Sequence, residues 1–280
     1  MAPPAVSGCV ICFNNAATIA TTLQSMRAQT VPVSDMVVVD DGSTDRSADV
    51  AGAAGARVVR HAVNRGRGAA RARAVSEAHG DLVLCVDATM TIPQNFVATL
   101  APWFDDSRVA AVCAPIDDPH PLGLVRRWRA RHLFRTGAAV GVSHQASLNT
   151  GGSVLRRSAV LEVGNFDPAF THREDADLGR RLLAHGYDVV FDRRIAASST
   201  TGNSLPQVLE RYWRWNMSAD ESISWRDYLK DIAYSVRVMA RHDYREGDLA
   251  AIPISLATPH YRAWKTWRQR NQPQAGQRSQ

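Results

Sequence analysis

The N-terminal half of the chain alternates short apolar segments with helical segments, and this pattern restricts the fold more than any other feature. Strand-like segments are Val6–Phe13, Asp35–Val39, Arg57–Arg60, Leu82–Val86 and Val109–Ala114, and the helical segments between them are Ala16–Ala28, Thr44–Ala54, Gly66–Ala78 and Asn95–Phe104. Such alternation predicts βαβ units and an α/β fold with a mostly parallel sheet flanked by helices. In such a sheet ligands bind at the carboxyl ends of the strands, where Asn14, Asp40, Asp41 and Asp87 fall.

The pattern changes after Pro115, where a turn-rich connector begins. The segments predicted beyond it are a basic helix at Leu122–Phe134, a strand at Leu148–Leu155, helices at Ser158–Val163 and Glu174–His185, and a strand at Tyr187–Phe191. Beyond Thr200 the chain is rich in Trp and Arg and is predicted to be helical. Its last ten residues, 271–280, are predicted to be disordered.

Length and composition agree with a folded globular protein. The chain has 280 residues, of which 45% are hydrophobic, enough for one large core or two joined half-domains. No apolar run reaches 18 residues, and the first residues lack the features of a signal peptide, so we expect a cytoplasmic protein. The four cysteines, Cys9, Cys12, Cys85 and Cys113, are predicted to be buried thiols rather than a metal or redox site, because residues three apart on a strand, like Cys9 and Cys12, face opposite sides.

The net charge of +6 suits an anionic ligand, an anionic membrane surface or nucleic acid. No zinc-finger spacing or other nucleic-acid motif accompanies it, so nucleic acid is not an expected partner. Two basic aromatic segments, Arg126–Arg135 and Tyr261–Arg270, are compatible with peripheral contact at the inner face of an anionic membrane. A solvated, arginine-rich surface is the alternative interpretation.

Several motifs then occur in order along the chain. They are VICFNNAATI, VVVDDGSTDRS, NRGRGAARA, LNTGGSVLRRSAVLEVGNFDPAF, REDADLGRRLLAHGYDVVF and, more weakly, RYWRW. From Val6 to Trp215 the chain resembles the family 2 glycosyltransferases of GT-A fold, inverting enzymes that transfer a sugar from a nucleotide-sugar donor. The resemblance implies a Rossmann-like GT-A fold. Residues 1–115 would form its nucleotide-sugar-binding half, residues 116–200 its acceptor-side and catalytic half, and residues 201–270 a helical C-terminal extension.

The resemblance also implies a donor site. Asp40 and Asp41 would accept hydrogen bonds from a uracil-like N–H and from ribose hydroxyls, so UDP is the expected nucleotide. The DDGSTD segment is equally typical of a turn and a helix cap, and we expect both roles together. The arginines after Asn64 lie at a helix start, which favours anions, although a solvated basic face would look the same. The predicted nucleotide-sugar-binding residues are Asn14, Asp40, Asp41, Arg67, Arg71, Asp87, Gly151 and Gly152.

The chain departs from this family at the metal site. Members usually carry Asp-x-Asp, whose carboxylates hold a divalent cation against the diphosphate, whereas this chain reads Asp87-Ala88-Thr89. Ser198 and Ser199 stand where members often place a histidine ligand. Mn²⁺ or Mg²⁺ is therefore a doubtful cofactor, with Asp87 as its one candidate ligand. Three explanations of this departure are possible. In order of preference, Asp87 and the diphosphate together hold a cation, arginines neutralise the leaving group without a metal, or the domain binds the donor and does not transfer the sugar.

The family's catalytic base is the Asp of a Glu-Asp pair, which falls on Asp175. A base must remove the acceptor hydroxyl's proton as that hydroxyl attacks the anomeric carbon. Carboxylates in a first helical turn also complement the helix dipole, which is the structural alternative. The resemblance places acceptor contacts at Glu174, Arg211, Arg214 and Trp215.

These observations predict an inverting hexosyltransferase that acts on a polysaccharide or a lipid-linked glycan, as in the biosynthesis of a cell-envelope polysaccharide. The alternative is a catalytically silent nucleotide-sugar-binding module that regulates an active transferase.

Overall fold

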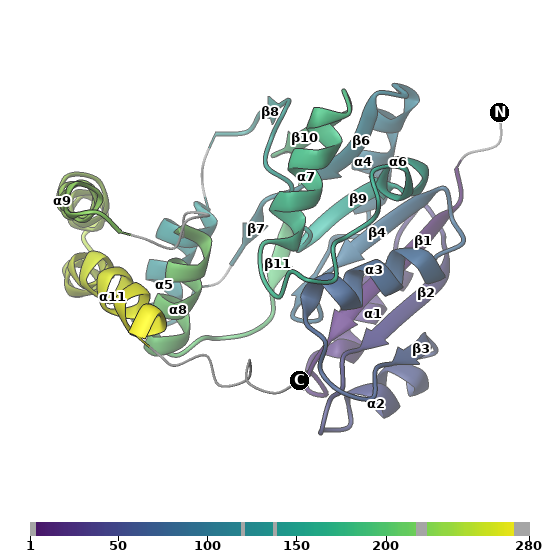
Figure 1. The fold of residues 1–280 in the computed structure, drawn as a ribbon, viewed down its shortest axis with the longest axis horizontal. Coiled ribbons are helices and arrows are strands. Elements are labelled where there is room, and N and C mark those ends of the chain that lie inside the picture. Colours follow the sequence, from purple (N-terminus) through teal and green to yellow (C-terminus); the bar gives the residue numbers. More distant parts are fainter. Residues whose placement is uncertain (1–3, 119–120, 137–138, 217–222, 272–280) are drawn as a thin grey trace, which may run out of the picture. The chain divides into compact units, whose positions relative to one another are not determined.

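The computed structural model describes residues 4–118, 121–136, 139–216 and 223–271 (Figure 1). The chain forms two compact units. Unit 1 comprises Met1–Pro119 and Thr136–Thr201, and unit 2 comprises His120–Arg135 and Gly202–Gln280. The tail predicted to be disordered lies outside the described residues, apart from Asn271.

Unit 1 contains an eight-stranded sheet in the order β3-β2-β1-β4-β9-β6-β10-β8. Its strands are β1 Val6–Cys12, β2 Val33–Asp40, β3 Arg57–Arg60, β4 Leu82–Val86, β6 Val109–Cys113, β8 Val142–Ser143, β9 Gly152–Arg156 and β10 Asp188–Asp192. Strands β3, β2, β1 and β4 pair in parallel, as do β6 and β10, whereas β9 is antiparallel to both of its neighbours. The predicted mostly parallel sheet is confirmed, and the strand predicted at Leu148–Leu155 begins four residues later.

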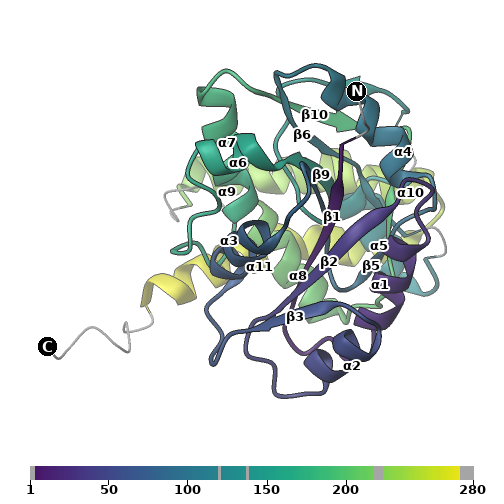
Figure 2. The ribbon, with the colours of Figure 1, turned by 90° about the vertical axis from the view of Figure 1, so that its right-hand side faces the viewer.

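Helices cover both faces of this sheet (Figure 2). Apolar residues of α1 Ile19–Arg27, α2 Ser47–Ala53 and α4 Phe96–Leu100 belong to one buried cluster, and those of α3 Arg67–Glu77, α6 Arg157–Glu162 and α7 Glu174–Ala184 belong to the other. A 3₁₀ turn, η1 Ala101–Asp105, continues α4. Because successive strand residues point to opposite faces, Cys9 lies in the second cluster and Cys12 in the first. All four cysteines are buried free thiols, as predicted.

A second sheet of three very short strands was not predicted from the sequence. It consists of β5 Met90–Thr91, β11 Ala197–Ser199 and β7 Ile116–Asp117, in that spatial order. Strands of two or three residues are too short to show an alternating pattern, so only their pairing in the fold reveals them. The sheet brings Ser198 against Asp117, whose Oδ1 accepts a hydrogen bond from the serine hydroxyl at 2.7 Å.

Unit 2 is helical. Its elements are α5 Leu124–Arg129, the π-helical turn η2 Ala130–Phe134, α8 Leu205–Asn216, α9 Trp225–Tyr234, the π-helical turn η3 Ser235–Ala240, α10 Arg241–Arg245, the 3₁₀ turn η4 Leu249–Ala251 and α11 Ile252–Asn271. None of the described helices is long and apolar enough to cross a membrane.

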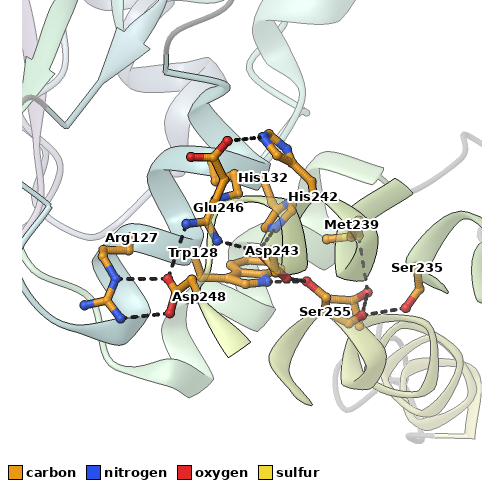
Figure 3. Close-up of polar contacts among 12 residues, drawn as sticks. Arg127, Trp128, His132, Ser235, Met239, His242, Asp243, Glu246, Asp248 and Ser255 are labelled. Atoms are coloured by element: carbon orange, nitrogen blue, oxygen red, sulfur yellow. Dashed lines mark hydrogen bonds and ion pairs between the residues drawn. The ribbon is translucent and has the colours of Figure 1, made fainter. Parts of the chain in front are cut away.

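A buried polar network joins α5 and η2 to the C-terminal helices (Figure 3). Asp243 is fully buried; one of its oxygens lies 2.7 Å from Nε2 of His132, and the other accepts a hydrogen bond from the Ser255 hydroxyl. The Ser255 Oγ in turn accepts a hydrogen bond from the indole N–H of Trp128 at 2.8 Å. Buried carboxylates need such partners. Residues 121–135 therefore belong to the same compact unit as the C-terminal helices, and the acceptor-side half predicted at residues 116–200 stays a prediction.

Candidate functional site

Asp40 and Asn14 fix the turn that follows β2. Asp40 is fully buried; its Oδ1 accepts a hydrogen bond from the backbone N–H of Ser43 at 3.2 Å, and its Oδ2 lies 3.0 Å from Nε of Arg60. Asn14 adopts a positive φ of 56°, and its side-chain oxygen accepts a hydrogen bond from the backbone N–H of Thr44 at 2.9 Å. These contacts brace the loops after β1 and β2 against each other. The predicted nucleotide contacts of Asp40 and Asn14 stay predictions.

Asp41 fixes the loop that leads into α3. Its Oδ1 accepts a hydrogen bond from the backbone N–H of Arg65 and lies 2.7 Å from Nδ1 of His61. Its Oδ2 accepts a hydrogen bond from the N–H of Gly66 at 2.9 Å. Gly66 has a φ of 87°, which disfavours residues with a side chain. Asp41 therefore sets the entry of α3, in addition to the nucleotide contact predicted for it.

Arg71 connects two acidic residues that are far apart in the sequence, Asp87 and Glu174. Its Nε donates to Oε1 of Glu174 at 3.0 Å, and one of its terminal nitrogens donates to Oδ1 of Asp87 at 2.7 Å. Arg67, one turn earlier on α3, donates to the same Glu174 oxygen at 2.8 Å. Arg71 is 3% exposed and Glu174 is 1% exposed. The carboxylate of Glu174, which was predicted to bind the acceptor, therefore forms ion pairs with two arginines of the donor half.

A close backbone approach makes this bridge possible. The N–H of Gly68 donates to the carbonyl of Phe170 at 2.9 Å, and a Cβ at Gly68 would lie 2.2 Å from the carbonyl oxygen of Asp167. Only glycine permits this contact between the first turn of α3 and the loop before α7. Sequence reasoning did not single out Gly68, although the NRGRG motif carried the signal.

Asp175 lies in the first turn of α7 and is half-buried. Burial raises the pKa of its carboxyl, and the negative charge of Glu174 raises it further, while Arg67 and Arg71 oppose this shift without cancelling it. A carboxylate whose pKa lies above the ordinary aspartate range is a better proton acceptor. The predicted general base therefore has a proton affinity that suits the role.

Asp177, the third carboxylate in the first turn of α7, has local partners. In the structure Asp177 is paired with Arg180 at 2.6 Å and with Arg181 at 2.8 Å. Residues three and four positions apart lie on the same helix face, so this pairing is local to α7. The arginines that lower the pKa of Asp175 come instead from α3, which only the tertiary structure brings near.

Few side chains in the candidate site could ligate a metal ion. No group of three or more His, Cys, Asp or Glu side chains that could hold a metal occurs within the described ranges. Oδ1 of Asp87 is paired with Arg71, and its Oδ2 would lie 3.6 Å from a Cβ at Gly151. The tighter contact of that Cβ would be with Ile116 Cδ1, at 2.8 Å, so residue 151 is a glycine for packing reasons. Gly152 has a packing reason of its own, because its Cβ would lie 2.6 Å from that of Ala197.

The remaining predicted acceptor residues lie on α8 in unit 2. Trp215 is 51% exposed; its ring centroid is 6.2 Å from that of Phe134, and the guanidinium carbon of Arg211 lies 6.0 Å from it. Arg214 is on the same helix and also makes contacts within the protein. Trp213 is buried and donates to Thr266, so it is a core residue. The acceptor roles of Arg211, Arg214 and Trp215 stay predictions.

Comparisons with known proteins agree with this architecture. Residues 7–164 match the family described as Glycosyl transferase family 2. The chain is 32% identical over 234 residues to the succinoglycan biosynthesis protein ExoU of Rhizobium meliloti, which covers 73% of this chain and 64% of ExoU. It is 30% identical over 185 residues to a pre-mycofactocin glycosyltransferase of Mycobacterium tuberculosis, which covers 62% of this chain and 38% of that protein.

Among solved structures, the mannosyltransferase PcManGT from Pyrobaculum calidifontis superimposes with a TM-score of 0.61 at 18% sequence identity. The match covers 94% of this chain and 83% of that one. At this identity the likeness concerns the fold, and it confirms the predicted GT-A fold. Because the family match extends over more than half of the chain, residues 7–164, the chain belongs to glycosyl transferase family 2.

Proposed function

We propose that this glycosyltransferase moves a hexose from a nucleotide-sugar donor, with UDP as the nucleotide, to a polysaccharide or lipid-linked glycan acceptor with inversion. One observation carries the proposal. The buried Arg71 guanidinium binds Asp87 of the donor half and Glu174, the direct neighbour of Asp175, so a donor at Asp87 is close to the proposed base. A cytoplasmic site of action is part of the proposal.

In the proposed reaction the acceptor hydroxyl oxygen bonds to the anomeric carbon while the bond from that carbon to the diphosphate breaks. Asp175 accepts the hydroxyl proton in the same step. Attack from the side opposite the diphosphate inverts the anomeric centre. Glu174 holds Arg67 and Arg71 in place and raises the pKa of Asp175, so it acts as a positioning residue.

The leaving diphosphate needs positive charge that Arg67 and Arg71 do not fully supply. Asp87, Glu174 and Asp175 together outweigh the charges of Arg67 and Arg71 by one negative unit. A divalent cation at Oδ2 of Asp87 and the diphosphate oxygens would supply that charge. The structure of PcManGT contains GDP-Man and Mn²⁺, which supports this order of preference over neutralisation by arginines alone.

The acceptor class rests on the relatives. ExoU is named for succinoglycan biosynthesis, which supports a polysaccharide acceptor here. We propose that Arg211, Arg214 and Trp215 contact this glycan, since an exposed indole and guanidinium groups suit stacking on a sugar and hydrogen bonds to its hydroxyls.

The decisive experiment compares Asp175→Asn with Asp177→Asn. Both variants remove one carboxylate from the first turn of α7, so each removes one favourable interaction with the helix dipole. A thermal-shift panel of nucleotide sugars, with and without Mn²⁺, first identifies the donor, because a ligand that binds only the folded state raises the melting temperature. Release of free nucleotide from that donor then measures turnover.

We expect both variants to bind donor like the wild type, and Asp175→Asn alone to lose turnover by about 10²-fold or more. Equal turnover by the two variants would return Asp175 to a capping role. Donor binding without any turnover by the wild type, across a panel of glycan acceptors, would favour the silent regulatory module instead.

A further inference from the structure

The basic charge of the chain is concentrated in one unit. Unit 2 carries 17 Arg and Lys residues against 8 Asp and Glu, a net charge of +9, whereas unit 1 has a net charge of −3. The nucleotide-sugar site predicted from the sequence lies in unit 1, apart from its proposed acceptor residues. An anionic donor therefore does not explain the excess, and unit 2 needs a partner of its own.

Helix α9 carries an apolar stripe with basic residues beside it. Trp225, Leu229 and Ile232 are spaced to share one face, and none of the ten residues of α9 is buried. Trp225 is 71% exposed and Leu229 is 47% exposed. Arg226 and Lys230 lie one position further along and are exposed, with Nζ of Lys230 3.5 Å from Oδ1 of Asp227. Arg270 of α11 lines the groove next to Trp225 and adds basic charge there.

Polar side chains next to this stripe hold α9 on α11. The hydroxyl of Tyr228 lies 2.8 Å from Nδ1 of His260, and Asp231 is paired with Arg262 at 2.6 Å. These contacts leave Trp225 and Leu229 largely exposed, whereas the helix of a soluble domain usually buries its apolar side.

Two further tryptophans extend the surface onto α11. Trp225 and Trp267 line the same groove between α9 and α11, and Trp267 is 65% exposed. Trp264, one turn before Trp267, is 46% exposed and lies under the guanidinium of Arg268. Tryptophan at the rim of an apolar stripe, flanked by Arg and Lys, is the composition of helices that lie in the interface of a bilayer.

We propose that the Trp225 face, defined as Trp225, Leu229, Ile232 and Trp267 with the flanking Arg226 and Lys230, binds an anionic lipid bilayer. The apolar side chains enter the boundary between headgroups and acyl chains, and the basic row contacts the anionic headgroups. The other segment that the sequence suggested for this role, Arg126–Arg135, does not form such a surface, because Trp128 and Arg129 are fully buried.

Co-sedimentation of the full chain with lipid vesicles tests this proposal. We expect binding to vesicles of equal parts phosphatidylcholine and phosphatidylglycerol, and much weaker binding to pure phosphatidylcholine. Raising the salt concentration should reduce the difference, because salt screens exposed charges. Wild-type protein that stays in the supernatant with the anionic vesicles would overturn the proposal.

Matched variants locate the surface. Trp225→Ala with Leu229→Ala should weaken partitioning by about tenfold or more, since both apolar side chains leave the interface. Arg226→Gln with Lys230→Gln should weaken it about fivefold per charge, on anionic vesicles only. The control, Leu122→Ala with Leu249→Ala, changes two residues of unit 2 that are 78% and 58% exposed, and it should bind like the wild type.

Equal partitioning of the Trp225–Leu229 variant and the control would overturn the proposal. A concentration-dependent dimer that this variant abolishes, without vesicle binding, would also overturn it by assigning the face to a second copy of the chain. The vesicle assay does not depend on sugar transfer, so its failure leaves the proposed function standing.

Discussion

Replacing Arg71 by Met tests the bridge that assembles the candidate site. Arg71 is 3% exposed and Glu174 is 1% exposed, so the variant leaves a buried carboxylate with Arg67 as its remaining cationic partner. Asp87 also loses its ion pair with Arg71, but its side chain is 25% exposed and in reach of water. The loss of folding stability in this variant therefore arises mainly at Glu174.

Removing one member of a buried ion pair typically costs about 3–5 kcal/mol. The side chain of Arg67 is 40% exposed and compensates Glu174 incompletely, so we expect the lower end, about 3 kcal/mol. For a chain of this size that corresponds to a fall in melting temperature of about 6–12 °C. The control, Arg73→Met on the same helix, breaks an exposed pair with Glu77 and should cost about 1 kcal/mol at most.

Differential scanning calorimetry suits the measurement, because six of the seven tryptophans lie in unit 2 and fluorescence would report mainly on that unit. The double variant Arg71→Met with Glu174→Gln removes both charges and should regain most of the lost stability. Equal losses for Arg71→Met and Arg73→Met would refute the argument, as would a double variant less stable than Arg71→Met alone.

The pH dependence gives an independent check. Burial would raise the pKa of Glu174, but the charges of Arg67 and Arg71 outweigh it and hold the pKa below the ordinary glutamate range. A carboxylate with a lowered pKa stabilises the fold above its unfolded pKa, and this contribution is lost as pH falls through the folded pKa. The difference in free energy of unfolding between the wild type and Arg71→Met should therefore be largest near neutral pH and become smaller in acid.

Three further predictions follow from the same geometry. Because the pKa of Asp175 is raised, the transfer rate should fall on acidification at a pH above the ordinary aspartate pKa. Glu174→Gln should move this fall to lower pH, and an unchanged pH profile would contradict the role of Asp175 as the base. Calorimetry should show weak Mn²⁺ binding without nucleotide, and Thr89→Asp should tighten Mn²⁺ binding in the presence of UDP; tight binding to the unliganded wild type would mean that other ligands exist. Gly68→Ala should lower stability by about 1–3 kcal/mol, because its Cβ would clash with a backbone carbonyl that cannot rotate away, and a neutral effect by calorimetry would argue against the close approach of α3.

The strands and helices of the donor half could be predicted from the sequence because their apolar residues repeat with the period of the element. The strands at Arg57–Arg60 and Leu82–Val86 have the predicted bounds, α3 is one residue shorter than predicted at each end, and α7 begins at the predicted residue and ends one residue earlier. The carboxyl-end position of Asp40, Asp41 and Asp87 follows from the same pattern. Local periodicity and turn chemistry thus suffice for the fold class and for the edge of the sheet that holds the site.

Partners that are distant in sequence required the tertiary structure. No local pattern indicates that Arg67 and Arg71 would meet Glu174, that Asp41 would take up the amides of Arg65 and Gly66, or that residues 121–135 would pack with the C-terminal helices. The exposed stripe of α9 is a similar case, because periodicity shows that a helix is amphipathic but not whether its apolar face is covered. Sequence determines which residues share a face, whereas the pairing of faces depends on long-range packing that only the folded chain specifies.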